Sequence, residues 1–272
     1  MKQMKSLLSG LAVCCILVGS AYAQKSSEFG LLLGASSYAG DLNPLFFDPA
    51  FIHPAGGLIY RHNLNYHYAF KADILYGTIS GDDSHSSVPY NRFRNLSFQS
   101  PVIEGSAQYE FNFLPYEVGA PEHSFTPYIF AGLSIFYFNP KALFNGAWQE
   151  LQPLGTEGQG LPGKPKPYKL IQPAIPFGMG LKWGWKDMTF GFESGLRKTF
   201  TDYLDDVSGK YVDSGVLGQT AAQLAYRSTE GIVVSGKQRG NSQSKDWYMF
   251  SGLCISFKFG GKGEGVNCHA FH

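Results

Sequence analysis

Strict alternation between large apolar residues and small or polar residues is the feature that most limits how this chain can fold. In the segment 172–185, QPAIPFGMGLKWGW, every second residue from Ile175 to Trp185 is large and apolar, and the residues between them are Pro, Gly or Lys. A repeat of two places successive side chains on opposite faces of a β-strand. The segment is therefore predicted to be a strand with one wholly apolar face.

The same alternation recurs along the chain in seven further segments, which are 29–38, 55–62, 68–80, 95–113, 127–138, 188–200 and 246–259. An even number of strands of about ten residues, separated by turn signals, is typical of bacterial outer-membrane barrels. The composition agrees, because aromatic residues reach 15%, glycines number 33 and charged residues are only 16%. We predict an all-β fold, an eight-stranded antiparallel transmembrane β-barrel of the outer membrane with long extracellular loops.

The second face of the predicted strands carries small and charged residues, and the charged ones are Lys71, Asp73, Glu104, Glu110, Lys182, Glu193 and Arg197. In a soluble β-sandwich or a lipocalin-like barrel, the apolar face would point inward instead. The interior of an eight-stranded barrel is filled by side chains, so we expect the charged residues to form a structural network of ion pairs there. Acid–base chemistry by a pair of these carboxylates is the alternative.

The connections between the predicted strands alternate in length. The turns around 63–65, 114–126 and 186–187 are short or compact, whereas the connections 39–54, 81–94, 139–171 and 201–245 are longer. Outer-membrane barrels place short turns in the periplasm and long loops outside, and an even strand count returns both chain ends to the periplasm. The connection 139–171 is rich in Gly and Pro and is expected to be mobile.

The N-terminus has the pattern of a secretory signal peptide. Two lysines precede the apolar run 7–20, and Ala21-Tyr22-Ala23 follows it, so cleavage is expected between Ala23 and Gln24. We therefore divide the chain into a signal peptide (1–23), an outer-membrane β-barrel (24–259) and a periplasmic C-terminal tail (260–272). The expected location is the bacterial outer membrane, reached by export.

The sequence carries no familiar catalytic signature. It contains no Gly-x-Ser-x-Gly, His-Glu-x-x-His or Cys-x-x-Cys motif, and the histidines are scattered through predicted turns and loops. The net charge of +1 gives no basic surface for nucleic acid. We expect a protein that is not an enzyme and that uses no cofactor, no metal and no nucleic acid.

The segment 199–213, TFTDYLDDVSGKYVD, is the most acidic stretch and therefore a candidate metal site. Asp202, Asp205, Asp206 and Asp213 do not follow the alternate spacing of an EF-hand, and no closing Glu is present. Asp side chains bond readily to nearby backbone N–H groups, so turns at the base of a long outer loop are the expectation. A weak surface Ca²⁺ site is the alternative.

Several stretches together resemble a known family. These are SSYAGDLN (36–43), DILYGTISGDD, RNLSFQSPVIEGSAQYEFNFLPY, GLRKTFTDYLDDVSGKYVD and the cysteine-containing C-terminal tail. They are similar to PorG-type outer-membrane β-barrel proteins of the Bacteroidetes type IX secretion system, over most of the mature chain.

The resemblance implies a non-enzymatic component of that secretion system, which anchors a periplasmic ring of the lipoprotein PorK and of PorN to the outer membrane. It implies contacts with outer-membrane lipid and with further components of the translocon. Two alternatives remain at this point. One is an OmpX-like structural or adhesive barrel that acts through its outer loops, and the other is a lipid A-modifying enzyme.

The expected periplasmic surface comprises the turn 114–126 and the tail, with Leu114, Tyr116, Glu117, His269 and Phe271 as candidate contacts. Without the signal peptide, two cysteines remain, Cys254 in the last strand and Cys268 in the tail. Cys254 is expected to face the lumen. Cys268 is expected either to pair with Cys254 within the chain or to pair with a cysteine of a partner, unless both stay free thiols.

Overall fold

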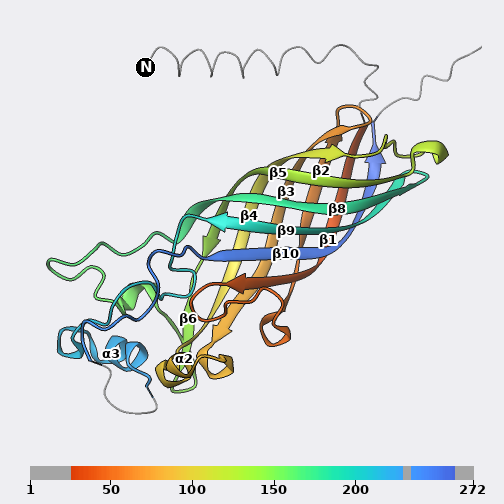
Figure 1. The fold of residues 1–272 in the computed structure, drawn as a ribbon. Helices are drawn as coiled ribbons and strands as arrows, with labels where there is room; N and C mark the ends of the chain where they lie inside the picture. The colour runs from red at the N-terminus through yellow and green to blue at the C-terminus, as the bar shows by residue number, and fades with distance from the viewer. Residues whose placement is uncertain (1–25, 229–233, 261–272) are drawn as a thin grey trace, which may run out of the picture.

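The computed structural model describes residues 26–228 and 234–260 and forms a barrel with its longest loops gathered at one end (Figure 1). Its wall consists of eight strands, which are β1 (Ser26–Ala39), β2 (His53–Asn63), β3 (Tyr68–Asp82), β4 (Ser97–Asn112), β5 (Phe125–Phe138), β8 (Ile171–Trp185), β9 (Met188–Thr199) and β10 (Trp247–Phe259). Each one overlaps a strand predicted from the alternation. The boundaries differ by a few residues, for example at β1, which begins three residues before the predicted start.

Antiparallel pairing between sequence neighbours and between the first and last strands closes the wall. β1 pairs with β10 from Ser27↔Phe259 to Ala39↔Trp247, and β3 pairs with β4 along fifteen residues of each strand, from Tyr68↔Phe111 to Asp82↔Ser97. The ring β1-β2-β3-β4-β5-β8-β9-β10 therefore has no free edge. The predicted eight-stranded antiparallel barrel is confirmed.

The outer face of the wall is apolar. Leu33, Met179 and Trp183 are 62%, 66% and 60% exposed, whereas the neighbouring Lys182 is 1% exposed. A soluble barrel or sandwich would bury the former side chains and expose the latter. The inside-out arrangement is that of a transmembrane barrel of the outer-membrane type.

All seven charged residues predicted to face the lumen are buried there. They are joined by two that the prediction lacked, Glu28 and Arg61. Glu28 lies before the predicted start of the first strand, so the alternation did not predict that its side chain faces the lumen. Among the described residues, four lumen cations therefore face five carboxylates, and the lumen is filled by ion pairs.

Glu110 is the centre of one part of this network. It accepts a hydrogen bond from Nε of Arg61 at 2.9 Å and another from Nζ of Lys182 at 2.7 Å, while Nη1 of Arg61 reaches Glu28 at 3.3 Å. The charges are thus paired and hydrogen-bonded, which is the condition under which charge is tolerated away from water.

Three further carboxylates belong to the lumen network, and one of them, Asp73, lies 3.7 Å from Nζ of Lys71. Glu193 accepts from Nζ of Lys71 at 2.5 Å and from the hydroxyl of Tyr128 at 2.7 Å. Glu104 accepts from Nε of Arg197 at 3.1 Å and from the hydroxyl of Tyr248 at 2.6 Å. The expected structural network is confirmed.

The long loops contain secondary structure of their own. They include the helices α2 (Pro89–Arg94) and α3 (Gln219–Ala225), the hairpin β6 (Lys141–Phe144) and β7 (Ala147–Glu150), and the 3-10 turns η1 (Pro49–Phe51), η2 (Asp83–His85), η4 (Gln152–Leu154) and η5 (Ser214–Val216). One more 3-10 turn, η3 (Pro121–His123), lies in the compact connection at the other end. No helix in the described ranges is long and apolar enough to cross a membrane.

The hairpin β6–β7 was missed because it lies inside a segment read only as rich in Gly and Pro. Its turn is Asn145-Gly146, and both residues have positive φ, 49° and 79°. Asn-Gly is the preferred sequence for such a two-residue hairpin turn, so this signal was present in the sequence. Thr156 and Glu157, further along the same connection, are buried against other loops instead of projecting freely.

Removal of one lumen charge tests the network. We expect Glu110→Gln to destabilise the barrel by about 3–5 kcal/mol, because Lys182 loses the carboxylate that it binds, whereas Arg61 keeps Glu28. Urea unfolding in detergent micelles, followed by the heat-dependent shift in gel mobility, measures the change. The control is Glu150→Gln, which breaks an exposed pair with Lys141 and should cost less than about 1 kcal/mol. Equal stability of the two variants would contradict the network's structural role.

Candidate functional site

The end of the barrel with short turns is closed by the connection between β4 and β5. The ring of Tyr116 is 2% exposed, and its hydroxyl lies 2.7 Å from Oγ1 of Thr189 on β9. Nζ of Lys182 lies 5.3 Å from the centre of that ring. Nearby, Nζ of Lys258 donates to the backbone carbonyl of Val118 at 3.1 Å. The connection is therefore a plug over this mouth of the lumen.

This closure decides which of the predicted contact residues a partner can reach. Leu114 is 47% exposed and Glu117 is half-buried, so both side chains are accessible at this end. Tyr116 is instead enclosed by the wall and is not a surface residue. Ala23, Gln24, Cys268, His269 and Phe271 lie outside the described residues.

Cys254 faces the lumen, as predicted, and is 5% exposed. It forms no disulfide within the described part of the chain. Ser256, the next lumen-facing residue of β10, is paired in register with Thr189, to which Tyr116 bonds. The Tyr116 plug therefore lies between Cys254 and the short-turn end.

The opposite end carries a cap formed by the four long loops, and Arg239 and Arg94 hold these loops together. Nη1 of Arg239 donates to Oε1 of Glu157 at 3.0 Å, which joins the fourth loop to the third. Arg94 binds Asp83 at 2.6 Å and donates to the backbone carbonyl of Asp41 at 3.0 Å, which joins the second loop to the first. Arg94 also donates to the backbone carbonyl of Arg239.

The acidic stretch 199–213 lies inside this cap. Asp205 accepts a 2.5 Å hydrogen bond from the hydroxyl of Tyr38 at the end of β1. Asp206 has a positive φ of 65°, and its carboxylate accepts from the hydroxyls of Tyr168 and Thr156. Two of the aspartates also form the expected local turns, since Asp205 accepts from the N–H of Val207 and Asp213 from that of Gly215.

Burial perturbs the acids of the cap. It raises the pKa of Asp202 to about 7 and that of Asp206 to about 6. The pKa values of Asp205 and Asp246 are also raised by burial, and neighbouring carboxylates raise both of them further. Neither carboxylate oxygen of Asp202 accepts a hydrogen bond of ordinary geometry from the described residues. Burial in the cap therefore disfavours the ionised form of these four carboxyl groups.

The chemistry available at either end is limited. No group of three or more His, Cys, Asp or Glu side chains among the described residues is arranged to hold a metal ion. The perturbed acids of the cap accept hydrogen bonds from tyrosine hydroxyls of β1 and the third loop and from a backbone N–H of their own loop. Their hydrogen bonds hold the loops in place, and Asp246 also lines a hollow between the first and fourth loops.

The family of the chain is shown by a match over residues 5–218 to the family described as "Domain of unknown function (DUF6089)". The chain belongs to the DUF6089 family. This match spans the first seven barrel strands and part of the cap. A search among curated proteins finds no match.

Solved structures of bacterial outer-membrane proteins show a distant likeness to this DUF6089 chain. Ail of Yersinia pestis, in complex with the heparin analogue sucrose octasulfate, is 10% identical with a TM-score of 0.42, over 87% of this chain and 99% of that one. The N-terminal β-barrel domain of Pseudomonas aeruginosa OprF is 13% identical with a TM-score of 0.36, over 87% and 100%. A major outer membrane protein of Thermus thermophilus is 10% identical with a TM-score of 0.35, over 86% and 99%.

The raised pKa of Asp202 predicts a pH-dependent cap. Because the folded-state pKa of about 7 exceeds the ordinary value of 3.8, its contribution to stability is fully present below pH 4 and is lost as the pH rises through 7. We expect Asp202→Asn to slow proteolytic cleavage of the cap at pH 8 by at least about an order of magnitude, because the pKa shift of Asp202 exceeds one unit, and to change it little at pH 4. The exposed Asp213→Asn controls for the loss of one charge. Equal cleavage of Asp202→Asn and the wild type at pH 8 would contradict the prediction.

Proposed function

We propose that the chain is a non-enzymatic outer-membrane component of a type IX protein secretion system, of the PorG type, and that it anchors the periplasmic PorK/PorN ring to the outer membrane. The sequence resemblance supports the choice of system. The observation that carries the anchoring role is the closed lumen, which is filled by ion pairs and plugged by Tyr116 at one mouth. A barrel whose lumen is filled in this way leaves no conduit through the described residues and acts through its surfaces.

The surface proposed for the ring is the short-turn end. β1 begins and β10 ends at this end (Figure 1), and short turns face the periplasm in outer-membrane barrels. Leu114 and Glu117 are the accessible candidate contacts on the described part of that end. They offer a partner one exposed apolar side chain beside one carboxylate, and the plug beneath them gives a rigid base.

The proposed partners are the lipoprotein PorK, the ring protein PorN and further components of the translocon, with outer-membrane lipid around the barrel. The lumen acids and bases support the non-enzymatic part of the proposal, because they are paired with one another beneath the Tyr116 plug. A general acid or base must instead lie within hydrogen-bond reach of a substrate.

A second candidate is a structural or adhesive barrel of the OmpX type, and the observation that favours it is the folded cap of four loops. Deletion of the gene separates these functions. Loss of secreted cargo, with cargo retained in the periplasm, supports the secretion component. An unchanged secretome with lost surface attachment supports the adhesive barrel, and an unchanged secretome with an altered lipid A mass supports a lipid A-modifying enzyme.

The proposed ring surface can be tested by pull-down of the tagged protein from detergent-solubilised outer membrane. We expect the double variant Leu114→Asp, Glu117→Lys to recover about tenfold less of the ring proteins, the scale for loss of a central interface anchor. Leu143→Asp in the hairpin β6–β7, which is 49% exposed at the opposite end, is the matched control. Equal recovery by the wild type and the double variant would exclude this surface, and no ring protein with the wild type would exclude the anchoring role.

The position of Tyr116 limits which disulfide bonds the two cysteines can form. Because Tyr116 separates Cys254 from the short-turn end, we expect Cys268 to pair with a cysteine of a partner and Cys254 to stay a free thiol. Non-reducing electrophoresis of membranes should show a heavier, reducible band that disappears in Cys268→Ser and persists in Cys254→Ser. A pattern with only the monomer, or a band that needs both cysteines, would contradict pairing with a partner.

A further inference from the structure

The outer wall has a dent near the long-loop end, where small residues replace large ones. Across β9, β10 and β1, the residues Ser194, Ser251 and Ala35 lie side by side in register and share the outward face. The row on the side of the short turns contains Phe192 and Leu253, which are 48% and 63% exposed. A barrel surface that only had to contact fluid lipid would have no need for this hollow.

The loop between β1 and β2 covers one side of the dent. Phe46 and Phe47 of this loop line the edge of the dent, Phe46 half-buried and Phe47 72% exposed, and Met249, although it faces outward on β10, is only 6% exposed. Together these side chains line a groove of about 530 Å³, whose apolar lining also includes Phe177, Met179, Leu196, Ile129 and Phe130. The groove is therefore a defined concave site and not an irregularity of the wall.

The polar side chain in the floor of the groove already has a hydrogen-bond partner in the wall. The hydroxyl of Ser194, the polar side chain of the lining, lies 2.7 Å from the hydroxyl of Ser251. Gly178 lies beside it, and a Cβ at that position would come within 2.2 Å of the carbonyl oxygen of Ser194. The matching ligand is an alkyl chain.

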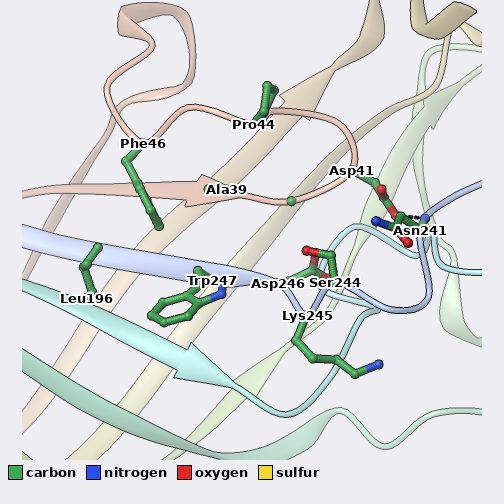
Figure 2. Close-up of a pocket in the computed structure, with 11 residues that line it drawn as sticks. Ala39, Asp41, Pro44, Phe46, Leu196, Asn241, Ser244, Lys245, Asp246 and Trp247 are labelled. Atoms are coloured by element: carbon green, nitrogen blue, oxygen red, sulfur yellow. Dashed lines mark hydrogen bonds between the residues drawn. The ribbon is translucent and has the colours of Figure 1, made fainter.

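A second, polar hollow continues the groove toward the cap. It has a volume of about 490 Å³ and shares Phe46 and Leu196 with the apolar groove. Figure 2 shows Phe46 pointing down toward the wall that carries Leu196 and Trp247, with Lys245 below the polar residues of the fourth loop. The two hollows form one amphipathic site on the outside of the barrel.

Trp247 marks the level of the membrane interface between the two hollows. Its ring packs edge-to-face on Phe177 of the apolar groove, with 6.0 Å between ring centres, and Nζ of Lys198 lies 6.0 Å from its centre. Tryptophan side chains of membrane proteins gather at the headgroup level, where lysines also extend toward water. The apolar groove therefore lies at acyl-chain depth and the polar hollow at headgroup depth.

The exposed charge beside the polar hollow is cationic. Lys198 and Lys245 are both exposed, and Lys245 uses one donor on the carbonyl of Ser242 at 3.1 Å, so donors remain for a ligand. The two acids of the hollow both accept hydrogen bonds from backbone N–H groups of the fourth loop. Asp246 is 1% exposed and accepts from the N–H of Leu204, while Asp41 accepts from the N–H of Asn241.

We propose that this site holds one outer-leaflet membrane lipid with an anionic phosphate headgroup. Its acyl chain lies between Phe46, Phe47 and Met179, and its phosphate binds Lys198 and Lys245. The site is on the lipid-facing wall at the end opposite the proposed ring surface, so it is independent of the secretion proposal. Its function would be to fix the β1–β2 loop on the wall and to set the depth of the barrel in the membrane.

Native mass spectrometry of the detergent-purified protein tests the site with two lipids of equal chain length, dimyristoyl phosphatidylglycerol and dimyristoyl phosphatidylcholine. We expect the wild type to retain one copy of the anionic lipid about tenfold more than the zwitterionic one, the scale of two lysines near an anionic surface. The double variant Lys198→Gln, Lys245→Gln should lose this preference. The variant Ser194→Phe, which fills the dent, should lose both lipids.

Two control variants separate loss of the site from a general effect of removing lysines or adding an aromatic ring. Lys210→Gln, Lys237→Gln removes two exposed lysines of the same cap away from the groove and should keep the preference. Leu133→Phe places the same ring elsewhere on the lipid-facing wall and should retain the lipid. Heat-dependent gel mobility confirms that each variant is a folded barrel. Equal retention of the two lipids by the wild type, or an unchanged preference in Lys198→Gln, Lys245→Gln, overturns the proposal.

Discussion

The pairing of β1 with β10 is the constraint on which the rest of the structure depends. A membrane interior offers no water to satisfy backbone N–H and C=O groups, so a sheet can cross it only as a closed ring. Closure of eight strands leaves a lumen too narrow for a channel, and alternate residues must fill it. Because the outward residues face lipid, the polar half of each strand is confined to the inside, and the charges there have one another as partners.

Closure at both ends follows from the same confinement. Tyr116 covers one mouth of the lumen and bonds to the wall through Thr189, while the cap of long loops covers the other and reaches the wall through Tyr38 and Asp205. The protein therefore exposes three separate surfaces, which are the short-turn end, the cap and the lipid-facing wall. The ring anchor uses the short-turn end, the adhesive barrel uses the cap, and the lipid site uses the wall together with the edge of the cap next to it. Each proposal can therefore fail without the others.

The cap shows why sequence reasoning was accurate for the wall and incomplete for the loops. Alternation reports the environment of each strand residue locally, and it placed Glu110, Lys182 and Arg197 in the lumen on the strength of the sequence pattern. The bond between Tyr38 and Asp205 joins residues 167 positions apart, and no local pattern signals it. The burial of Tyr116 was missed for the same reason, since a tyrosine in a predicted turn gives no indication that the turn folds back over the barrel. The hairpin at Asn145-Gly146 is a different case, because the sequence does contain its turn signal and the hairpin could have been predicted from it.

By itself, the sequence determined the number of strands in the wall, the face that most of their residues take and seven of the nine charged lumen residues described above, because a period of two is imposed by the backbone of every strand. Only the tertiary structure decided which charges pair, which mouth is plugged and where the wall is hollow. Those features arise where residues from different strands and loops meet, and their distances depend on the register and closure of the whole barrel. The acidic stretch 199–213 illustrates the division, since its sequence marks it as polar and turn-rich, whereas its role in holding the cap together comes from partners on other segments of the chain.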